Sequence, residues 1–295
     1  MATASSPPPR AAFLAVVTVS YGSDGVLGPF LASLTGATTV PYEIIVADNK
    51  PSAGPSAIAR LTADAGGAYL PMQCNRGYGH AINEAVRALP ASFDWIVVSN
   101  PDVTVNVGAI DVLLEAVSND PTIGAVGPRI LSSEGQIYPS ARTIPSLRSG
   151  VGHALFANIW PSNPWTRTYR RETGSELTRR DAGWLSGAFL MVRRTVFDDL
   201  NGFDENYFMY FEDVDLGYRI GRAGLRNVYA PEATVVHTGA HSTRGDESVR
   251  MIRAHHTSAR RFLFKKYSGA WLWPVRLLIG AGLSVRVRLQ SRRLR

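Results

Sequence analysis

Apolar and amphipathic segments alternate along the first half of the chain. Continuous apolar runs that end in polar turn residues predict buried strands over residues 12–19, 43–49, 95–99 and 124–127. Amphipathic stretches predict helices at about residues 25–37, 55–65, 79–89 and 107–118. Strands and helices that alternate at this spacing favour an α/β fold, with an open, mostly parallel sheet flanked by helices.

The pattern is less regular beyond these elements. Residues 183–192 predict a glycine-containing turn before another buried strand, and residues 233–236 form a further strand-like run. Residues 132–181 are rich in Pro, Ser, Trp and Arg and lack periodicity, so we expect a long excursion over the sheet rather than a separate domain. Residues 1–11 are small and Pro-rich without an apolar core, which predicts a disordered leader rather than a signal peptide.

Charge is divided unevenly along the chain. The formal net charge is +7, yet residues 250–295 hold twelve Lys or Arg and no Asp or Glu, so the preceding body is mildly acidic. This division argues against nucleic acid as a partner, because nucleic-acid-binding domains carry their basic residues on the folded face. Apolar content of 45% and charged content of 19% indicate a folded globular protein. The single cysteine, Cys74, excludes an internal disulfide framework and a cysteine-based zinc cluster.

The basic C-terminal segment is also rich in large apolar residues. In residues 246–295, Trp, Leu, Ile and Val alternate with arginines, which favours a basic amphipathic helical tail on an anionic membrane surface. The alternative is a solvated helix with basic ends. Pro274, Arg276 and Arg286 interrupt the longest apolar stretch, so we expect no membrane-spanning helix.

Carboxylates follow two predicted strands and gather again further along the chain. Asp48 and Asp102 lie where strands end, and in open parallel sheets ligands bind at the carboxyl ends of the strands. Glu212, Asp213 and Asp215 crowd into four positions, where their mutual repulsion calls for a cation, a substrate or a basic partner. These two groups together predict a metal site that faces a general base.

A histidine completes the candidate metal site. His237 directly follows the strand-like run of residues 233–236. Hard divalent ions take carboxylate oxygens, and an imidazole ligand suits Mn²⁺ better than Mg²⁺, so Asp102 and His237 are the candidate ligands. Taken alone, Asp102 could equally be an ordinary turn residue.

Two glycine-containing loops are candidates for ligand contact. Residues 75–79, Asn-Arg-Gly-Tyr-Gly, open a predicted helix whose N-terminal amides could bind a phosphate or a sugar hydroxyl. They lack the full glycine fingerprint of a dinucleotide-binding loop, and a tight strand-to-helix turn explains them equally well. Trp184, which lies between Gly183 and Gly187, could stack on a sugar or pack in the core.

The motifs taken in order resemble the inverting GT-A glycosyltransferases of family 2 over nearly all of residues 12–241. The resemblance rests on residues 75–79, 99–103, 183–187 and 211–215. Residues 138–142, residues 160–165 and the basic tail are further similar to actinobacterial members that add L-rhamnose to a lipid-linked N-acetylglucosamine. The resemblance implies three segments: a leader over residues 1–11, a GT-A domain over residues 12–245 and a membrane-associating tail over residues 246–295.

The resemblance also implies roles for single residues. Asp213 would be the catalytic base, and Asp102 and His237 would hold a divalent metal, Mn²⁺ or Mg²⁺, on the donor diphosphate. Asn100 stands in place of the first Asp of the usual DxD motif, so we expect weaker metal binding. The donor side would comprise Asp48, Asn49, Asn75, Gly77, Asn100 and Asp102. The acceptor side would comprise Trp184, Gly187, Glu212 and Asp215.

The implied reaction takes dTDP-L-rhamnose as the donor and N-acetylglucosaminyl-diphospho-polyprenol as the acceptor. It would take place at the cytoplasmic face of the plasma membrane, in synthesis of the arabinogalactan linker. Another donor, UDP-galactofuranose or UDP-glucose, is the alternative within the family, because the fold does not determine the donor. A non-catalytic carbohydrate-binding protein and a nucleic-acid-binding protein are the alternatives outside it. The sequence leaves the oligomeric state open.

Overall fold

The computed structural model describes residues 14–54, 56–146, 177–239, 246–277 and 280. The predicted leader, the middle of the predicted excursion over residues 132–181 and the end of the predicted tail lie outside these ranges. The description below concerns only the ranges given.

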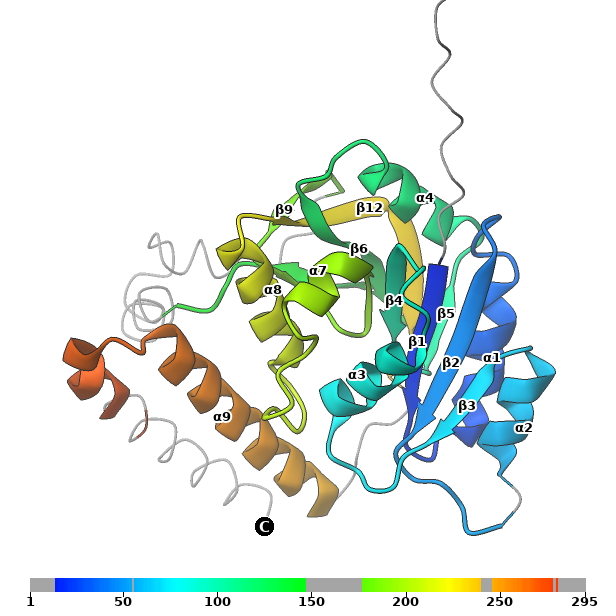
Figure 1. Cartoon of the computed structure of the whole chain (residues 1–295), viewed down its shortest axis with the longest axis horizontal. Helices are drawn as coiled ribbons and strands as arrows, with labels where there is room; N and C mark the ends of the chain where they lie inside the picture. Colours follow the sequence, from blue (N-terminus) through cyan, green and yellow to red (C-terminus); the bar gives the residue numbers. More distant parts are fainter. Residues whose placement is uncertain (1–13, 55, 147–176, 240–245, 278–279, 281–295) are drawn as a thin grey trace, which may run out of the picture.

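One twisted sheet runs through the molecule, with helices on both of its faces (Figure 1). The strand order is β3-β2-β1-β4-β11-β6-β12-β5. Strands β3, β2, β1 and β4 are mutually parallel, as are β6 and β12, whereas β11 and β5 run antiparallel to their neighbours. The bounds of these strands are Leu14–Ser20 (β1), Tyr42–Asp48 (β2), Ala68–Pro71 (β3), Trp95–Ser99 (β4), Val103–Val105 (β5), Ile123–Ser132 (β6), Phe189–Arg193 (β11) and Arg226–His237 (β12).

Four short strands lie beside this path. Ile137–Tyr138 (β7) pairs with β6, and Arg180–Ala182 (β9) pairs with β12. Ala141–Arg142 (β8) and Trp184–Leu185 (β10) form a separate antiparallel pair. The described ends of the predicted excursion over residues 132–181 therefore return to the sheet.

The helices divide between the two faces of the sheet. Alternate residues of β1 point to opposite faces, so Leu14 and Val16 join one apolar cluster and Ala15 and Val17 join the other. The first cluster takes side chains from α1 (Asp24–Leu34), α2 (Ala57–Asp64) and α4 (Ala109–Val117). The second takes side chains from α3 (Tyr78–Ala88), α7 (Arg194–Asp199) and α8 (Glu212–Arg222). Burial on both faces explains the continuous apolar runs of the central strands.

The long helix α9 (Asp246–Lys266) packs on the outer side of α8 (Figure 1). Phe262, which is fully buried, joins Tyr207 and Val214 in a third apolar cluster between the two helices. A short 3₁₀ helix, Ala270–Leu272, follows α9. No helix within the described ranges is long and apolar enough to span a bilayer.

The predicted fold class is confirmed, because a mostly parallel sheet lies between two layers of helices. The four predicted strands and four predicted helices are present, with ends that differ by a few residues, except that β6 extends to Ser132. The predicted helical character of the tail is present in α9.

Candidate active site

The carboxyl ends of β1, β2 and β4 meet at one edge of the sheet, where Ser20, Asp48 and Asn100 lie. The turn before β11 reaches the same edge, because Asn100 N donates a 2.9 Å hydrogen bond to Ala188 O. Among the described residues, the buried oxygens Ser20 Oγ and Asn49 Oδ1 have no hydrogen-bond partner. Buried polar atoms are normally paired, so these two oxygens mark the edge as a place for a polar ligand.

Asp102 and His237 lie in contact at this edge. Their meeting follows from the pairing of β12 with β5, which sets His237 opposite Val103, the residue after Asp102. His237 Nε2 lies 3.0 Å from Asp102 Oδ1 and 3.3 Å from Asn100 Nδ2. Thr238 N also donates to Asp102 O at 3.0 Å, which holds the two segments together.

The Asp102 and His237 pair fits a divalent ion. The 3.0 Å between Asp102 Oδ1 and His237 Nε2 is a direct ion-pair contact, and the same two atoms would be close enough together to hold one divalent ion. A carboxylate oxygen and an imidazole nitrogen form a donor set that suits Mn²⁺. An ion held by these two residues would keep further positions open to water or to a ligand oxygen.

Asp48 and Asn49 form the neighbouring part of the edge. The Asp48 carboxylate accepts hydrogen bonds from Lys50 N and from the Tyr69 hydroxyl, each at 3.0 Å. Asn49 Nδ2 donates to Gly77 O at 3.2 Å, which leaves Asn49 Oδ1 without a partner in the described chain. The carboxylate keeps unused lone pairs, so a ligand hydroxyl or amide could still donate to it.

The loop of residues 75–79 lies beside Asn49 and is fixed by its backbone. Gly77 has φ +109°, and Asn75 Oδ1 accepts a 3.0 Å hydrogen bond from Gly77 N. A Cβ at Gly77 would lie 2.2 Å from Phe208 O, so no larger residue fits. Tyr78 N donates to the same Phe208 oxygen at 3.1 Å. The loop therefore connects the edge where Asp48 and Asn49 lie to the segment that precedes Glu212.

Asp213 lies at the start of α8, and its carboxylate is held by main-chain amides. Gly187 N donates to Asp213 Oδ2 at 2.9 Å, and Val214 N donates to Asp213 Oδ1 at 2.8 Å. A Cβ at Gly187 would lie 3.4 Å from Asp213 Cβ, so the glycine permits this close approach. The preceding residues, Tyr210 and Phe211, both adopt positive φ, of 67° and 68°. Consecutive left-handed residues are strained and persist only where surrounding contacts impose them.

Glu212 and Asp213 form a buried acidic pair. Burial, together with the charge of Asp213, raises the pKa of Glu212 to about 8. Burial also raises the pKa of Asp213, while the amides of Gly187 and Val214 and the charge of Arg142 act in the opposite direction. The hydrogen bonds from Gly187 N and Val214 N and the charge of Arg142 stabilise the ionised form of Asp213 and not that of Glu212. Asp213 therefore loses its proton at a lower pH than Glu212 does. Glu212 stays protonated at neutral pH, and its Oε2 has no partner among the described residues.

Tyr78 connects the two halves of the site, and the sequence reasoning missed it. The Tyr78 hydroxyl donates to Gly187 O at 3.0 Å. Burial first, and then the negative charges of Glu212, Asp213 and Asp102, raise the pKa of Tyr78 well above its ordinary value. The phenol thus lies among carboxylates from both halves. Its place inside the Asn-Arg-Gly-Tyr-Gly motif was the only available signal.

Trp184 lies on the other side of Asp213, in the small sheet of β8 and β10. It is paired with Arg142, whose guanidinium lies over the indole ring at 5.9 Å from the ring centroid. Trp184 Nε1 donates to Thr143 O at 3.1 Å. A Cβ at Gly217 would lie 2.6 Å from Trp184 Cβ, so the tryptophan backbone packs tightly on α8. The main chain of Trp184 is therefore packed against α8, and its indole ring lies under the guanidinium of Arg142.

Asp215 lies away from the Asp213 carboxylate. Its side chain is fully buried and forms ion pairs with Arg219 at 2.6 Å and with Lys265 of α9 at 2.7 Å. Two residues along a helix differ by about 200° in direction, so Asp213 and Asp215 face different sides of α8. This placement favours a role in packing α9 on α8 over the predicted role at the acceptor.

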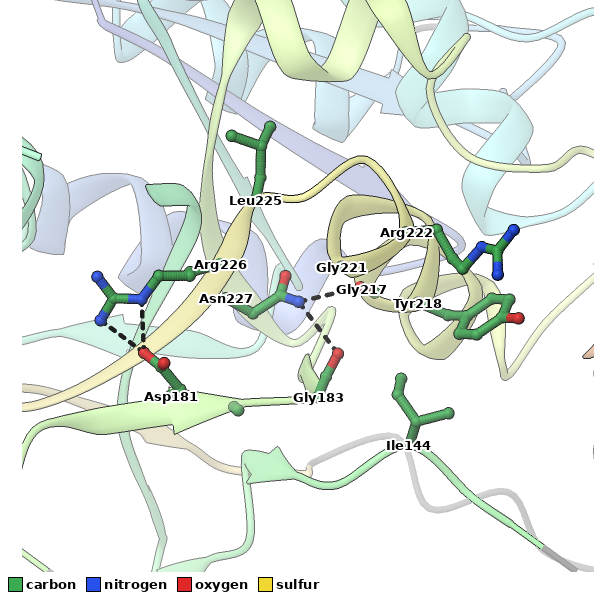
Figure 2. A pocket seen from close by; sticks show the side chains of 11 residues that line it. Ile144, Asp181, Gly183, Gly217, Tyr218, Gly221, Arg222, Leu225, Arg226 and Asn227 are labelled. Atoms are coloured by element: carbon green, nitrogen blue, oxygen red, sulfur yellow. Dashed lines mark hydrogen bonds and ion pairs between the residues drawn. The ribbon is translucent and has the colours of Figure 1, made fainter. Parts of the chain in front are cut away.

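Two further groups of residues lie outside this edge. A cavity of about 410 Å³ runs along α8, but its Arg226 is paired with Asp181 at 2.6 Å, and Asn227 Nδ2 donates to the oxygens of Gly183 and Gly217 (Figure 2). None of the predicted catalytic or metal-binding residues lines this cavity.

The second group consists of His80, Glu84 and Glu205, whose potential ligand atoms lie within 4.8 Å of one another. Glu205 already pairs with His80 at 2.8 Å and with Arg87 at 2.8 Å. Burial alone would raise its pKa, but hydrogen bonds from Arg87, Asn83 and His80 lower the pKa of Glu205 to about 2. We interpret this group as an ion-pair network.

The chain matches the model of the family described as "Glycosyltransferase like family 2" over residues 8–257. It is 44% identical over 289 residues to the N-acetylglucosaminyl-diphospho-decaprenol L-rhamnosyltransferase of Mycobacterium tuberculosis, covering 95% of this chain and 93% of the relative. It is 28% identical over 261 residues to rhamnosyltransferase WbbL of Escherichia coli, covering 85% of this chain and 92% of that protein.

Solved glycosyltransferase structures share the GT-A fold with this chain. Mannosyltransferase PcManGT from Pyrobaculum calidifontis, in complex with GDP-Man and Mn²⁺, aligns with a TM-score of 0.54 at 18% identity, over 92% of this chain and 75% of the other. GalNAc-T7 with UDP, GalNAc and Mn²⁺ aligns with a TM-score of 0.56 at 16% identity, over 78% of this chain and 44% of the other. At this identity the likeness concerns the fold alone.

Proposed function

The chain belongs to the glycosyltransferase-like family 2, and from that premise we propose that it is a metal-dependent, inverting rhamnosyltransferase. It takes dTDP-L-rhamnose as the donor and N-acetylglucosaminyl-diphospho-polyprenol as the acceptor. The 44% identity to the mycobacterial rhamnosyltransferase, over nearly the full length of both chains, supports this sugar and this acceptor. The pathway that such a product would enter is synthesis of the arabinogalactan linker.

One observation carries the catalytic assignment. Gly187 N orients the Asp213 carboxylate, and the next residue, Ala188, binds Asn100 of the donor edge through its oxygen. A short turn thus ties the base to the segment that carries Asp102. The buried carboxylate and the Asp102–His237 pair therefore lie on the two sides of one site.

We assign the chemical step to Asp213. Its carboxylate takes the proton of the acceptor hydroxyl while that oxygen forms a bond to the anomeric carbon of rhamnose. The bond from the anomeric carbon to the dTDP oxygen breaks on the opposite face, so the configuration inverts in one step. The raised pKa of Asp213 makes it a stronger base than an exposed aspartate, which suits this proton transfer.

The remaining residues of the donor edge bind and orient the nucleotide. Asp102 and His237 would hold Mn²⁺ or Mg²⁺, and such an ion supplies neutralisation of the charge on the departing diphosphate. Gly77 N and Tyr78 N already donate to Asn75 Oδ1 and Phe208 O, so binding of an anion at the start of α3 would fall to the amides that follow them. Asp48 and Asn49 would contact the nucleoside. Protonated Glu212 would offer a hydrogen bond to the acceptor sugar, beside Trp184 and Gly187.

We further propose that the chain works at the cytoplasmic face of the plasma membrane as a peripheral protein. Beyond α9, Trp271 is 80% exposed, Trp273 is 58% exposed and Leu277 is 63% exposed. Exposed tryptophans among basic residues are typical of segments that lie in the interface of an anionic membrane. This location would bring the enzyme to its lipid-linked acceptor.

A transfer assay tests the function. The purified protein is supplied with N-acetylglucosaminyl-diphospho-lipid and, in separate reactions, dTDP-L-rhamnose, UDP-galactofuranose or UDP-glucose, with Mn²⁺, Mg²⁺ or a chelator. We expect rhamnosyl transfer from dTDP-L-rhamnose, loss of transfer in chelator, and an inverted anomeric centre by NMR. Transfer from a UDP sugar alone would show that the donor is that sugar and not dTDP-L-rhamnose. Absence of transfer from all three donors would refute the enzyme assignment.

A further inference from the structure

Arg142 lies in the small sheet beside Asp213, and its terminal nitrogens donate to no described residue. Its Nε donates to Pro139 O at 3.0 Å, and its guanidinium lies over the Trp184 ring. Within the part of the chain that the structure describes, no residue accepts a hydrogen bond from its two terminal nitrogens. The side chain is half-buried, so these donors are held in place and yet accessible.

The same small sheet that carries Arg142 also positions the base. Leu185 pairs with Ala141, and Ser186 N donates to Ser140 O at 2.8 Å, so the turn that leads to Gly187 is fixed against the Arg142 strand. Burial raises the pKa of Asp213 most and main-chain hydrogen bonds lower it, and the positive charge of Arg142 lowers it further by a smaller amount, so the guanidinium lies within electrostatic reach of the base.

The chain after Arg142 reaches the C-terminal end of α9. Lys266, the last residue of α9, donates from Nζ to Pro145 O at 2.7 Å. Pro145 is three positions after Arg142, a span of at most about 11 Å. The exposed Trp271 and Trp273 follow α9 directly. Arg142 therefore lies between the base and the exposed apolar surface of the tail.

We propose that Arg142 binds the diphosphate of the lipid-linked acceptor and so places the acceptor hydroxyl at Asp213. This proposal rests on the proposed function, because it concerns the acceptor side of the same site. In a productive complex, the sugar of the lipid-linked acceptor lies at Asp213 and its diphosphate lies one sugar ring away. Its polyprenyl chain extends towards the membrane. The line from Asp213 through Arg142 to the tail has this order.

The chemistry of arginine fits this role. A guanidinium offers two parallel N–H donors that match phosphate oxygens, and stacking on an aromatic ring fixes its plane. The donor diphosphate belongs to the opposite side, at Asp102, His237 and the loop of residues 75–79. Arg142 is paired instead with Trp184, on the side proposed for the acceptor.

Two acceptors distinguish phosphate binding from an effect on the base. Initial rates are measured for the unchanged protein, Arg142→Gln, Arg142→Lys and the control Arg179→Gln. The control removes the same charge from an exposed arginine that pairs with Glu232 at 3.5 Å. One acceptor is N-acetylglucosaminyl-diphospho-farnesol, and the other is octyl N-acetylglucosaminide, which has no phosphate. We expect Arg142→Gln to raise KM about tenfold or more for the diphosphate acceptor alone, with Arg142→Lys intermediate and Arg179→Gln unchanged.

A binding measurement keeps the proposal testable without turnover. Farnesyl diphosphate, with no sugar, is titrated calorimetrically into the protein loaded with dTDP and Mn²⁺. We expect binding that Arg142→Gln weakens about tenfold, while the Kd for dTDP stays the same. Equal binding of farnesyl diphosphate by the variant, or loss of dTDP affinity instead, would overturn the proposal.

The kinetic readout has its own contrary outcome. A fall in kcat at unchanged acceptor KM, with a shifted acid limb in the pH profile, would assign Arg142 to the base rather than to the phosphate. Failure of the unchanged protein to transfer rhamnose would refute the proposed function, and the farnesyl diphosphate titration would still decide whether Arg142 binds a diphosphate.

Discussion

Ser258 of helix α9 donates a 2.8 Å hydrogen bond to the main-chain oxygen of Met209. Met209 directly precedes Tyr210 and Phe211, the two left-handed residues that lead into Glu212 and Asp213. The His255 ring lies edge-on to Tyr210 and Phe211, at centroid distances of 5.5 and 5.4 Å. Helix α9 thus supplies contacts that hold the strained turn before the base.

We expect Ser258→Ala to lower kcat several-fold with little change in the Kd for dTDP. The substitution removes the hydrogen bond to the oxygen of half-buried Met209, which costs about 0.5–1.5 kcal/mol and loosens the turn that places Asp213. Rates under saturating substrate and calorimetric titration with dTDP measure the two effects. Thr257→Ala is the matched control, because Thr257 is adjacent, carries a hydroxyl and is exposed. An equal loss in both variants would contradict a specific role for Ser258.

Asp213→Asn should reduce turnover by about 10²–10⁴-fold, the usual contribution of a positioned general base. The amide oxygen of asparagine can accept only one of the two hydrogen bonds from Gly187 N and Val214 N, so we expect some loss of stability. The residues proposed to bind dTDP are unchanged, so dTDP should still bind. Single-turnover transfer and dTDP calorimetry on the same preparation separate chemistry from binding. Near-normal turnover would remove Asp213 from the role of base.

The pH dependence of stability should change in Glu212→Gln. Burial raises the pKa of Glu212 from 4.5 to about 8 in the folded protein, so folding favours its protonated form. Its contribution to stability is therefore fully present below pH 4.5 and is lost as the pH rises through about 8. Glutamine does not titrate, and each pKa unit corresponds to about 1.4 kcal/mol.

Urea unfolding between pH 5 and pH 9 measures this difference. We expect the free energy of unfolding of the unchanged protein to fall relative to that of Glu212→Gln as the pH rises. Parallel curves for the two proteins would show that Glu212 keeps an ordinary pKa in the fold.

The central strands could be predicted because they are buried on both faces and need continuous apolar runs. Residues 95–99 were predicted to the residue, since Asp94 and Asn100 bound the run. Edge and interrupted strands carry no such signal. Strand β3 is short and half-buried. Strand β12 extends over twelve residues, although only residues 233–236 form a continuous apolar run that predicts a strand. Pro231 and Glu232 interrupt it where the pairing register with β6 shifts.

The site could be predicted where function follows from position at strand ends. Asp102 follows the carboxyl end of β4 and His237 ends β12, and the antiparallel pairing of β12 with β5 brings the two side chains into contact. Tyr78 and Arg142 were missed as site residues, since each reaches the base only through contacts between distant segments. Asp215 was grouped with Asp213 by its closeness in sequence, although helical geometry turns the two carboxylates apart.

Gly77→Ala should destabilise the fold and abolish dTDP binding. The positive φ of 109° disfavours any side chain, and a Cβ would lie 2.2 Å from Phe208 O, so the loop and the segment before Glu212 must separate. We expect a loss of about 1–3 kcal/mol or more in the free energy of unfolding. Gly221→Ala is the control, because it lies in α8 with no atom within 4 Å of its Cβ. That variant should gain about 0.5–1 kcal/mol.

The tail should bind anionic membranes through its tryptophans. Trp271 and Trp273 are 80% and 58% exposed, and Arg276 follows them closely in the sequence. The segment therefore combines exposed aromatic side chains with a cationic one. In flotation with vesicles that contain 30% phosphatidylglycerol, we expect the double variant Trp271→Ala, Trp273→Ala to lose most of its bound fraction. The Kd for dTDP should stay unchanged, because both residues lie outside the donor edge.

A matched control and a salt series make this last test decisive. Val107→Ala removes apolar surface from a side chain that is 89% exposed and precedes α4, far along the chain from the tail, and it should leave flotation unchanged. If basic residues act with the tryptophans, binding should weaken as salt rises and should fail on vesicles of neutral lipid alone. Equal flotation of the double variant and the unchanged protein would show that another surface meets the membrane. Salt-insensitive binding to neutral vesicles would remove the electrostatic part of the proposal.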